Sequence, residues 1–393
     1  MSEAPFYFIA IHGGAGYHPP SSDSSIRRSL RTAVSSALTT LTTVDSNESG
    51  SGSRRPGTSP TALDTTTALV AALEDSLEFN AGYGSNLTFD GDVECDAALM
   101  DGGCCAFGGV GAVRCVRNPV LLARCVLDAR RQQQPRLGLG LGRVPPLLLV
   151  GEGAVRFAAE RGGRAGAVEE PAEMVTPRAR REWEVWRERW EDEERRTSGP
   201  SDGLGAPDLT MLRARQDTVG AVVVQGDAGD VAAGVSSGGL LLKPSGRVGE
   251  AAVFGAGCWA ERLSDGRSIA CSVSGQGELI VQSSMAKTLA ERIAAAEGDT
   301  HDVLRSVLVD HFYSKWHLRG EHQPAVGVLL LTRGMDGDES TTRLWCAFTT
   351  QSMAVAYSSS QHPKPKALVL RNTTHDFSNE DARPPLFITT LSF

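Results

Sequence analysis

The sequence predicts an α+β fold in which two β-sheets pack between two layers of helices. Strand-like segments gather near both ends of the chain and helical segments lie between them, which favours sheets layered with helices. The composition is typical of a globular protein, with 41% hydrophobic and 22% charged residues. A chain of 393 residues is long enough to bury a large core. We expect one domain over residues 1–393.

The first third of the chain alternates short apolar segments with helical ones. Strand patterns and glycine-rich turns mark the element boundaries. Proline suits a first helical turn, so a helix is expected to begin at Asn118-Pro119. The other predictions are strands at 6–11 and 93–99, helices at 24–43 and 64–77, glycine-rich turns at 12–16 and 80–87, and a β-prone segment at 144–150.

Two segments differ from the rest in composition. Residues 45–60 are rich in Ser, Gly and Pro and are expected to form a flexible surface loop. Residues 162–216 are expected to be a charged linker that contains a helix at 177–196. Trp183, Trp186 and Trp190 fall on one face of that helix. This face either docks on its own domain or binds a partner or substrate.

The second half of the chain is dominated by strand patterns. Helices are expected at 278–296 and 301–315. Strands are expected at 219–224, 231–236, 252–259, 268–273, 326–332, 344–348 and 353–357.

Charge and motif content exclude several classes of protein. The net charge of −8 argues against a general nucleic-acid binder. No apolar run reaches the roughly 18 residues of a membrane span, and the N-terminus does not resemble a signal peptide. The eight cysteines form no Cys-x-x-Cys pair, which indicates reduced thiols and no zinc site. Phosphate-loop and dinucleotide motifs are missing from the sequence. We expect an intracellular protein of the cytoplasm or nucleus, with no cofactor and no metal.

A candidate nucleophile stands at Asp217-Thr218-Val219-Gly220, directly before an apolar strand. A threonine hydroxyl is a poor nucleophile unless a base lies beside it. One such base is the α-amine of the threonine itself, which is free only if the preceding peptide bond is cut. The motif is therefore interpreted as a self-cleavage junction between Asp217 and Thr218. The same four residues are also an ordinary way to enter a strand.

Three further motifs follow the candidate nucleophile. Ser236-Ser237-Gly238-Gly239 lies about 18 residues later, where an antiparallel strand would bring its hydroxyls close to Thr218. Arg247 lies between two glycines and can bind a carboxylate through two hydrogen bonds. Residues 274–278 lie where a strand enters a helix, and backbone N–H groups there suit an oxyanion hole. Each motif alone is also compatible with an ordinary turn. His12 is interpreted as a structural turn histidine rather than a general base.

Taken together and in this order, the motifs resemble the plant-type asparaginase family of N-terminal-nucleophile hydrolases, from about residue 6 to about residue 357. The resemblance implies an αββα sandwich that cleaves itself into an α subunit, 1–217, and a β subunit, 218–393. Within the family the chain most resembles the threonine aspartase (taspase) branch of endopeptidases. Asp217 precedes the nucleophile where asparaginases generally carry glycine, and a protease that cuts after aspartate needs aspartate at its own junction.

The resemblance also implies catalytic roles for residues of the motifs. Thr218 would be the nucleophile and its freed α-amine the general base, while Ser237 would orient the threonine. Arg247 would bind the carboxylate of the recognised aspartate. Ser274 and Gly275 would form the oxyanion hole.

Three further residues are expected to contribute to substrate binding. Asn80 and Gly14 would shape the floor of the site. Glu250 stands where asparaginases carry an aspartate that binds the α-amine of the substrate, an aspartate that taspase-like chains lack. Because glutamate is also acidic, action on L-asparagine or isoaspartyl dipeptides remains open.

Three functions are therefore considered. The first is an endopeptidase that cuts protein substrates after internal aspartates. The second is an asparaginase or isoaspartyl peptidase, and the third is an inactive scaffold for protein interaction. The resemblance implies a homodimer of processed αβ units, and we expect neither nucleic acid nor membrane as a partner.

Overall fold

The computed structural model describes residues 6–43, 60–133, 144–163, 168, 170–197, 217–226, 228–296, 298–336, 339–377 and 384–391. Residues 45–59 of the expected loop lie outside the described residues, as do 164–167, 169 and 198–216 of the expected linker. The junction residues Asp217 and Thr218 are described.

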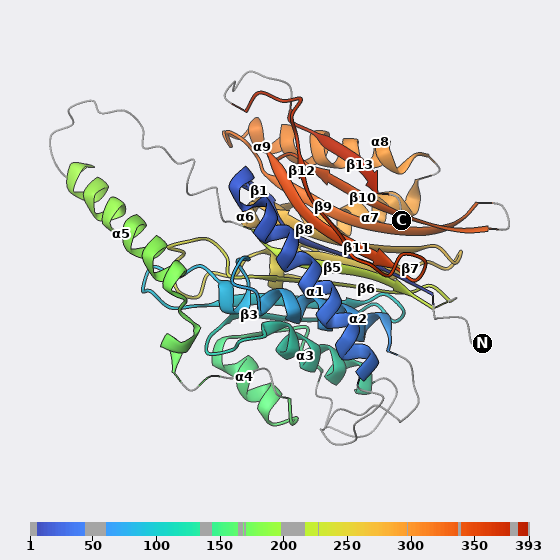
Figure 1. Ribbon diagram of the computed structural model, residues 1–393, viewed down its shortest axis with the longest axis horizontal. Helices are drawn as coiled ribbons and strands as arrows, with labels where there is room; N and C mark the ends of the chain where they lie inside the picture. Colours follow the sequence, from blue (N-terminus) through green and yellow to red (C-terminus); the bar gives the residue numbers. More distant parts are fainter. Residues whose placement is uncertain are drawn as a thin grey trace.

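Two sheets form the centre of the molecule (Figure 1). The larger has the strand order β12-β11-β1-β5-β6-β2-β3-β4 and the smaller the order β13-β10-β9-β8-β7. The strands of the larger sheet are β1 (Tyr7–Gly16), β2 (Cys95–Asp101), β3 (Ala106–Val113), β4 (Leu148–Val150), β5 (Val219–Gln225), β6 (Asp230–Ser237), β11 (Ser352–Ser359) and β12 (Lys366–Arg371). Those of the smaller sheet are β7 (Cys258–Arg262), β8 (Ser268–Gly275), β9 (Val326–Asp336), β10 (Glu339–Phe348) and β13 (Phe387–Leu391).

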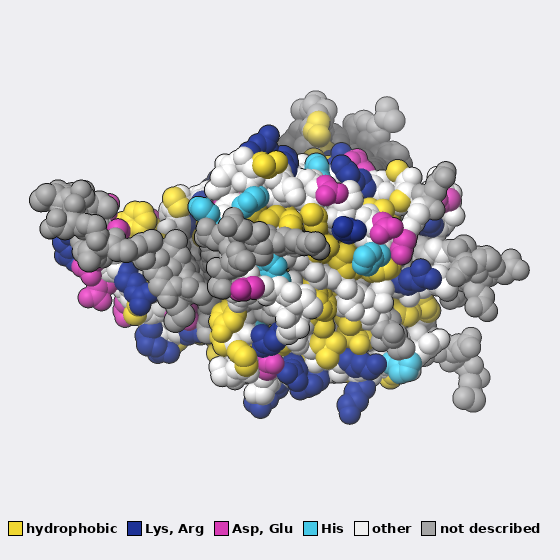
Figure 2. All heavy atoms as spheres, turned by 90° about the horizontal axis from the view of Figure 1, so that it is seen from above, with side chains coloured by type: hydrophobic (Ala, Val, Ile, Leu, Met, Phe, Trp, Pro, Cys, Tyr) yellow, Lys and Arg dark blue, Asp and Glu magenta, His cyan; other side chains and the backbone are white. Residues whose placement is uncertain are grey.

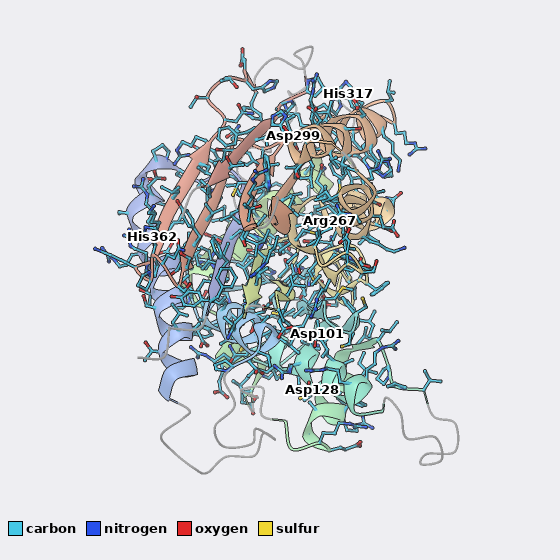
Figure 3. All side chains as sticks on the ribbon, turned by 90° about the vertical axis from the view of Figure 1, so that its right-hand side faces the viewer. Asp101, Asp128, Arg267, Asp299, His317 and His362 are labelled. Carbon is cyan, nitrogen blue, oxygen red and sulfur yellow. The ribbon has the colours of Figure 1, made fainter. Side chains whose placement is uncertain are left out.

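Helices cover the outer face of each sheet. Figure 3 shows the two helical layers at opposite ends of the stack, with Asp128 on α3 and His317 on α9. The larger sheet is covered by α1 (Asp23–Thr43), α2 (Ala62–Glu74), α3 (Pro119–Gln133) and α4 (Gly151–Ala159). The smaller sheet is covered by α6 (Gly277–Ser283), α7 (Met285–Ala295), α8 (Thr300–Arg305), a π-helix (Ser306–Ser314) and α9 (Lys315–His317). The predicted αββα layering is confirmed.

The central strand β5 is buried on both of its faces. Val222 and Val224 belong to the core between the two sheets, whereas Ala221 and Val223 pack against the helices that cover the larger sheet. Successive side chains of a strand point to opposite faces, so both faces of β5 need apolar residues. This is why the segment after Thr218 is continuously apolar rather than alternating.

Strands from the two sides of the Asp217–Thr218 junction interleave in the larger sheet. β1 lies between β11 and β5, and β2 pairs with β6, antiparallel in each case. The segments before and after the junction therefore share one core, and a cut at the junction leaves every strand pair in place.

The helix α5 (Pro177–Thr197) coincides with the helix expected at 177–196 and projects from the body of the molecule (Figure 1). Trp183 donates a hydrogen bond from Nε1 to the Thr88 carbonyl at 2.9 Å, and the Phe89 and Trp190 rings meet edge to face. The tryptophan face thus docks on its own chain. Figure 2 shows basic and acidic side chains mixed on this projecting end.

Several boundaries differ from the sequence predictions. The strand expected at 252–259 is wrong, because Glu250–Ala252 forms a 3-10 turn and the chain turns again at Gly255, where φ is +79°. The strand begins only at Cys258. The helix expected at 278–296 is broken at Ser284, which has the left-handed φ of 43°. Within the described residues, no helix combines the length and hydropathy needed to cross a bilayer.

A buried carboxyl group joins two of the covering helices. Glu74, the last residue of α2, is fully buried, and its Oε1 accepts a hydrogen bond from the Val120 N–H at 3.0 Å in the first turn of α3. Burial raises the pKa of Glu74 to about 8 and outweighs the hydrogen bonds that lower it.

The raised pKa of Glu74 predicts a pH dependence of stability. Between the ordinary pKa of 4.5 and about 8, the unfolded chain ionises while the folded chain keeps its proton. The free energy of unfolding therefore falls as pH rises through this window. Glu74→Gln keeps the carbonyl acceptor and removes this loss, which gives a gain over wild type on the order of 3 kcal/mol at pH 8.5 and little at pH 4.5.

Urea denaturation at the two pH values measures the effect. Glu78→Gln, in an exposed position next to α2, is the control, and it should leave the dependence of the unfolding free energy on pH unchanged. If the free energy of unfolding changes with pH in the same way for wild type and Glu74→Gln, the raised pKa of Glu74 is contradicted.

Candidate active site

Thr218 lies one residue before β5, at the end of the sheet sandwich. Val219 pairs with Ser236 in the β5–β6 ladder, so the next antiparallel pair sets Thr218 beside Ser237. Thr218 Oγ1 lies within hydrogen-bond distance of Ser237 Oγ, at 3.3 Å, and the threonine is only 1% exposed. Gly220 and Val222 follow Thr218 by two and four positions, so all three residues face the smaller sheet. The hydroxyl therefore lies between the two sheets.

An acceptor for the Thr218 hydroxyl proton comes from the 3-10 turn after β6. Thr218 Oγ1 donates a short hydrogen bond to Glu250 Oε1, and Glu250 is 3% exposed. Burial raises the pKa of Glu250 and the Asp96 charge adds to this, while the Thr218 hydrogen bond and the Arg247 charge oppose it.

Arg247 lies next to this carboxylate. Its Nε and Nη2 contact Glu278 Oε1 at 2.8 and 2.7 Å. A Cβ at Gly277 would lie 2.5 Å from Glu250 Oε2 and 2.6 Å from Arg247 Nη2. The Arg247 guanidinium and the Glu250 carboxylate therefore both lie against Gly277, which places a cation and an anion together beside Thr218.

Buried charged groups hold the turn that carries Arg247. Asp96 on β2 accepts from the Gly249 N–H at 2.8 Å, and the Glu94 carboxylate accepts from the Gly246 N–H at 2.7 Å. Lys243, 1% exposed, donates to the Glu94 carbonyl at 2.8 Å. The sequence analysis assigned no role to these residues. A carboxylate inside the strand pattern at 93–99 was the signal for Asp96, whereas nothing in the sequence distinguishes Lys243 from a surface lysine.

The junction between β8 and α6 lies where the sequence predicted a strand entering a helix. Ser274 Oγ accepts a hydrogen bond from the Ala15 N–H at 3.1 Å and so joins β8 to β1. Gly275 has a φ of +145°, and a Cβ there would lie 2.2 Å from the Ala325 carbonyl oxygen. Only glycine fits this position.

His12 lies inside β1 rather than in the turn where it was expected. Its Nε2 shares a hydrogen bond of 2.8 Å with Ser272 Oγ of the smaller sheet. Burial lowers the pKa of His12 to about 3, with the Thr218 backbone opposing part of the shift, so the ring is neutral near pH 7. The neutral His12 ring joins the larger sheet to the smaller one through its hydrogen bond with Ser272. This agrees with the structural role expected for His12.

Asp217, the residue before the candidate nucleophile, lies against the end of β1. Its Oδ2 is 3.4 Å from His18 Nε2. A Cβ at Gly14, whose φ is +103°, would lie 2.2 Å from the Asp217 Cβ. Gly14 therefore faces the Asp217–Thr218 bond, and His18 is a neighbour of this bond that was not predicted from the sequence.

Asn80 supports the site from behind. Its Nδ2 donates to the Gly239 carbonyl at 2.8 Å, and its Oδ1 accepts from the Asn86 N–H at 2.9 Å. The amide of Asn80 thus links its own loop, through Asn86, to the turn that follows Ser237. Ser237 Oγ in turn accepts from the Gly239 N–H at 3.0 Å.

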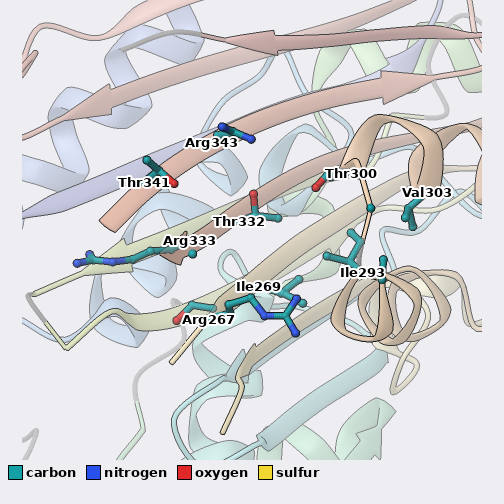
Figure 4. Close-up of a pocket in the computed structure, with 13 residues that line it drawn as sticks. Arg267, Ile269, Ile293, Thr300, Val303, Thr332, Arg333, Thr341 and Arg343 are labelled. Atoms are coloured by element: carbon teal, nitrogen blue, oxygen red, sulfur yellow. The ribbon is translucent and has the colours of Figure 1, made fainter. Parts of the chain in front are cut away.

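Two cavities lie at opposite ends of β8. One of about 590 Å³ adjoins the site and is lined by Tyr17, Gly275, Gln276 and Phe377 among others. The other, of about 360 Å³, is lined by residues such as Arg267 and Thr300 (Figure 4). The eight residues of β8 separate them by roughly 20 Å, so the second cavity is not part of this site.

Comparison with known proteins places this geometry in a family. The chain matches the asparaginase family over residues 5–310. The chain belongs to the asparaginase family. Across 308 residues it is 32% identical to an isoaspartyl peptidase/L-asparaginase of Rattus norvegicus, covering 78% of this chain and 76% of that protein. Across 280 residues it is 35% identical to an isoaspartyl peptidase/L-asparaginase of Homo sapiens, covering 71% and 74%. A plant-type L-asparaginase of Pyrococcus abyssi is 35% identical over 227 residues, with 58% of this chain and 65% of that protein covered.

Membership of the asparaginase family confirms the N-terminal-nucleophile fold and the hydrolase class. The names of these relatives refer to asparaginase and isoaspartyl peptidase activities. They agree with the second of the three functions considered, and the taspase branch is not distinguished by them.

Gly220 provides a test of the packing between β5 and β8. A Cβ there would lie 1.9 Å from Ser272 Oγ and 2.6 Å from His12 Nε2. Neither group can move without parting the sheets, so Gly220→Ala should lower the free energy of unfolding by about 1–3 kcal/mol. Chemical denaturation measures this change. Gly153→Ala in α4, where a Cβ meets nothing within 4 Å, is the matched control and should be neutral or slightly stabilising. Equal stability of the two variants would contradict the packing.

Proposed function

We propose that this chain cleaves itself between Asp217 and Thr218 and then hydrolyses the β-aspartyl bond of isoaspartyl dipeptides and the side-chain amide of L-asparagine. The closeness of the Arg247 and Glu250 head groups beside Thr218 supports this proposal. A substrate with a free aspartyl group carries an α-carboxylate and an α-ammonium on one carbon. A guanidinium and a carboxylate that lie together are complementary to that pair of charges.

Self-cleavage is the first stage of the proposed activity. The Thr218 hydroxyl attacks the Asp217 carbonyl, the acyl group shifts from nitrogen to oxygen, and water hydrolyses the resulting ester. The products are residues 1–217 and 218–393, held together by the interleaved strands. The new α-amine of Thr218 is then free to act as the base for its own hydroxyl.

Substrate hydrolysis is the second stage. Thr218 Oγ attacks the side-chain carbonyl of the bound aspartyl group and expels ammonia or an amino acid. Water then releases aspartate from the threonine ester. The strand end at Gly275 would supply a backbone N–H to the oxyanion, a contribution of about 10² to 10³ in rate. The neighbouring cavity, which Gly275 also lines, has room for the leaving amino acid.

An endopeptidase that cuts after aspartate is the second candidate, and one observation favours it. The Asp217 carboxylate lies 3.4 Å from His18 Nε2, so the chain already holds an aspartate at its own junction. Protein substrates with internal aspartates would enter the same way. Such substrates carry no free α-amine at the recognised residue, which leaves Glu250 without a binding role.

The two candidates are separated by their substrates. Purified protein is incubated with β-aspartyl-leucine, with L-asparagine and with a peptide that contains an internal Asp-Gly bond. We expect aspartate from the first two and an intact peptide, while Thr218→Ala should release nothing from any of them. Amino-acid analysis and mass spectrometry read both results. If only the internal Asp-Gly peptide is cleaved, the chain is an endopeptidase and our proposal fails. If Thr218→Ala is as active as wild type, Thr218 is not the nucleophile.

Arg247→Lys tests the binding of the substrate carboxylate. Lysine keeps the charge but loses the planar pair of donors, so KM for β-aspartyl-leucine should rise about tenfold to a hundredfold, with a smaller change in kcat. Steady-state kinetics gives both constants. Arg267→Lys, which lines the distant cavity and pairs with Asp265, is the control. A KM for Arg247→Lys as low as that of the control would show that Arg247 does not bind the substrate.

A further inference from the structure

Self-cleavage requires a base that the mature enzyme does not need. Before the cut, the nitrogen of Thr218 belongs to the Asp217–Thr218 peptide bond. An amide nitrogen has its lone pair delocalised into the carbonyl and does not accept a proton. The α-amine that serves the mature enzyme is therefore not available for the step that creates it.

Three side chains near Thr218 are candidates for the base that takes the proton of its hydroxyl. His12 is neutral, but its Nε2 is bound to Ser272, so it does not serve the threonine. Ser237 Oγ lies at 3.3 Å, and a serine hydroxyl is too weak a base to hold the proton. Glu250 Oε1 accepts the short hydrogen bond from Thr218 Oγ1, and a carboxylate can accept that proton.

The surroundings fix this carboxylate in place. Glu250 is 3% exposed, and its second oxygen lies where Gly277 leaves room for it against Arg247. Arg247 opposes the pKa-raising effects of burial and of Asp96 and so favours the ionised form. A buried base near its hydrogen-bond partner needs no rearrangement before it acts.

We propose that Glu250 is the general base of self-cleavage, taking the proton of the Thr218 hydroxyl as that oxygen attacks the carbonyl carbon of Asp217. The inference rests on the proposed self-cleavage at Thr218. Glu250 would then have a catalytic role in self-cleavage, in addition to the binding of the substrate amine in the proposed function.

The step balances as follows in atoms and charge. A bond forms between Thr218 Oγ and the Asp217 carbonyl carbon, and the proton passes from Oγ to Glu250 Oε1. The bond between that carbon and the Thr218 nitrogen then breaks, and the same proton passes to the nitrogen, which becomes the amine. Glu250 returns to its ionised form and the ester between Asp217 and Thr218 remains. Solvent water hydrolyses this ester in the next step.

The experiment follows cleavage of the full chain itself by intact mass, with no added substrate. Glu250→Gln keeps the shape of the side chain and removes its basicity, so the rate of cleavage should fall about 10²-fold or more. Glu250→Asp shortens the side chain by one methylene and should also be slow. Glu291→Gln, which removes an exposed carboxylate paired with Lys287, should cleave at the wild-type rate.

Chemical rescue separates proton transfer from a structural role. Glu250→Ala leaves a buried space that formate can enter, whereas the amide of Glu250→Gln fills it. Formate at high concentration should raise the rate of Glu250→Ala at least tenfold and leave Glu250→Gln unchanged. Thermal melting of each variant monitors folding.

Each outcome is decisive for one of the two proposals. If Glu250→Gln cleaves at the wild-type rate, or if formate does not rescue Glu250→Ala, the base is not Glu250, while Thr218-dependent cleavage still stands. If Thr218→Ala cleaves as wild type does, or if wild type stays one chain under folded conditions, self-cleavage at Thr218 fails and the inference fails with it.

Discussion

The antiparallel pairing of β5 with β1 on one side and β6 on the other is the constraint on which the site depends. Because side chains alternate along a strand, a shift of one residue in this register would turn Thr218 toward the helices. The observed register puts its hydroxyl between the sheets, next to Ser237. The same pairing brings Gly220 opposite His12 and the end of β1 against Asp217. The apolar core of β5 therefore fixes the polar site at its end.

Glycines make room for the polar groups that converge at this end of the sandwich. A Cβ at any of three glycines would collide with these groups. The close neighbours are Ser272 and His12 at Gly220, Glu250 and Arg247 at Gly277, and Asp217 at Gly14. Side chains that meet in a buried place need hydrogen bonds at close range, and a Cβ at any of these positions would push them apart. The glycine-rich motifs of the sequence thus reflect the packing of the site rather than flexibility.

Sequence patterns were sufficient to predict the layers of this fold. Apolar periodicity predicts the strand after Thr218 and the helix at 177–196 because their own residues determine them. The strand expected at 252–259 failed because apolar residues are buried in a turn as readily as in a strand, and a glycine with positive φ decides between the two. His18 and Lys243 were missed because their neighbours come from distant segments. His18 meets Asp217 from 199 positions away, and Lys243 meets Glu94 across 149 positions. Such contacts leave no local signal.

The Glu250 carboxylate has a role in both stages of the proposed activity. In the uncleaved chain this carboxylate reaches the Thr218 hydroxyl while remaining beside Arg247. Once the peptide bond is cut, the α-amine of Thr218 becomes the nearer base, and the carboxylate is released from proton transfer. It is then free to pair with the α-ammonium of a substrate whose α-carboxylate binds Arg247. Arg247 opposes the burial that raises the pKa of Glu250 and so favours the ionised form, which both stages require, since a protonated acid would neither accept the Thr218 proton nor attract an ammonium group.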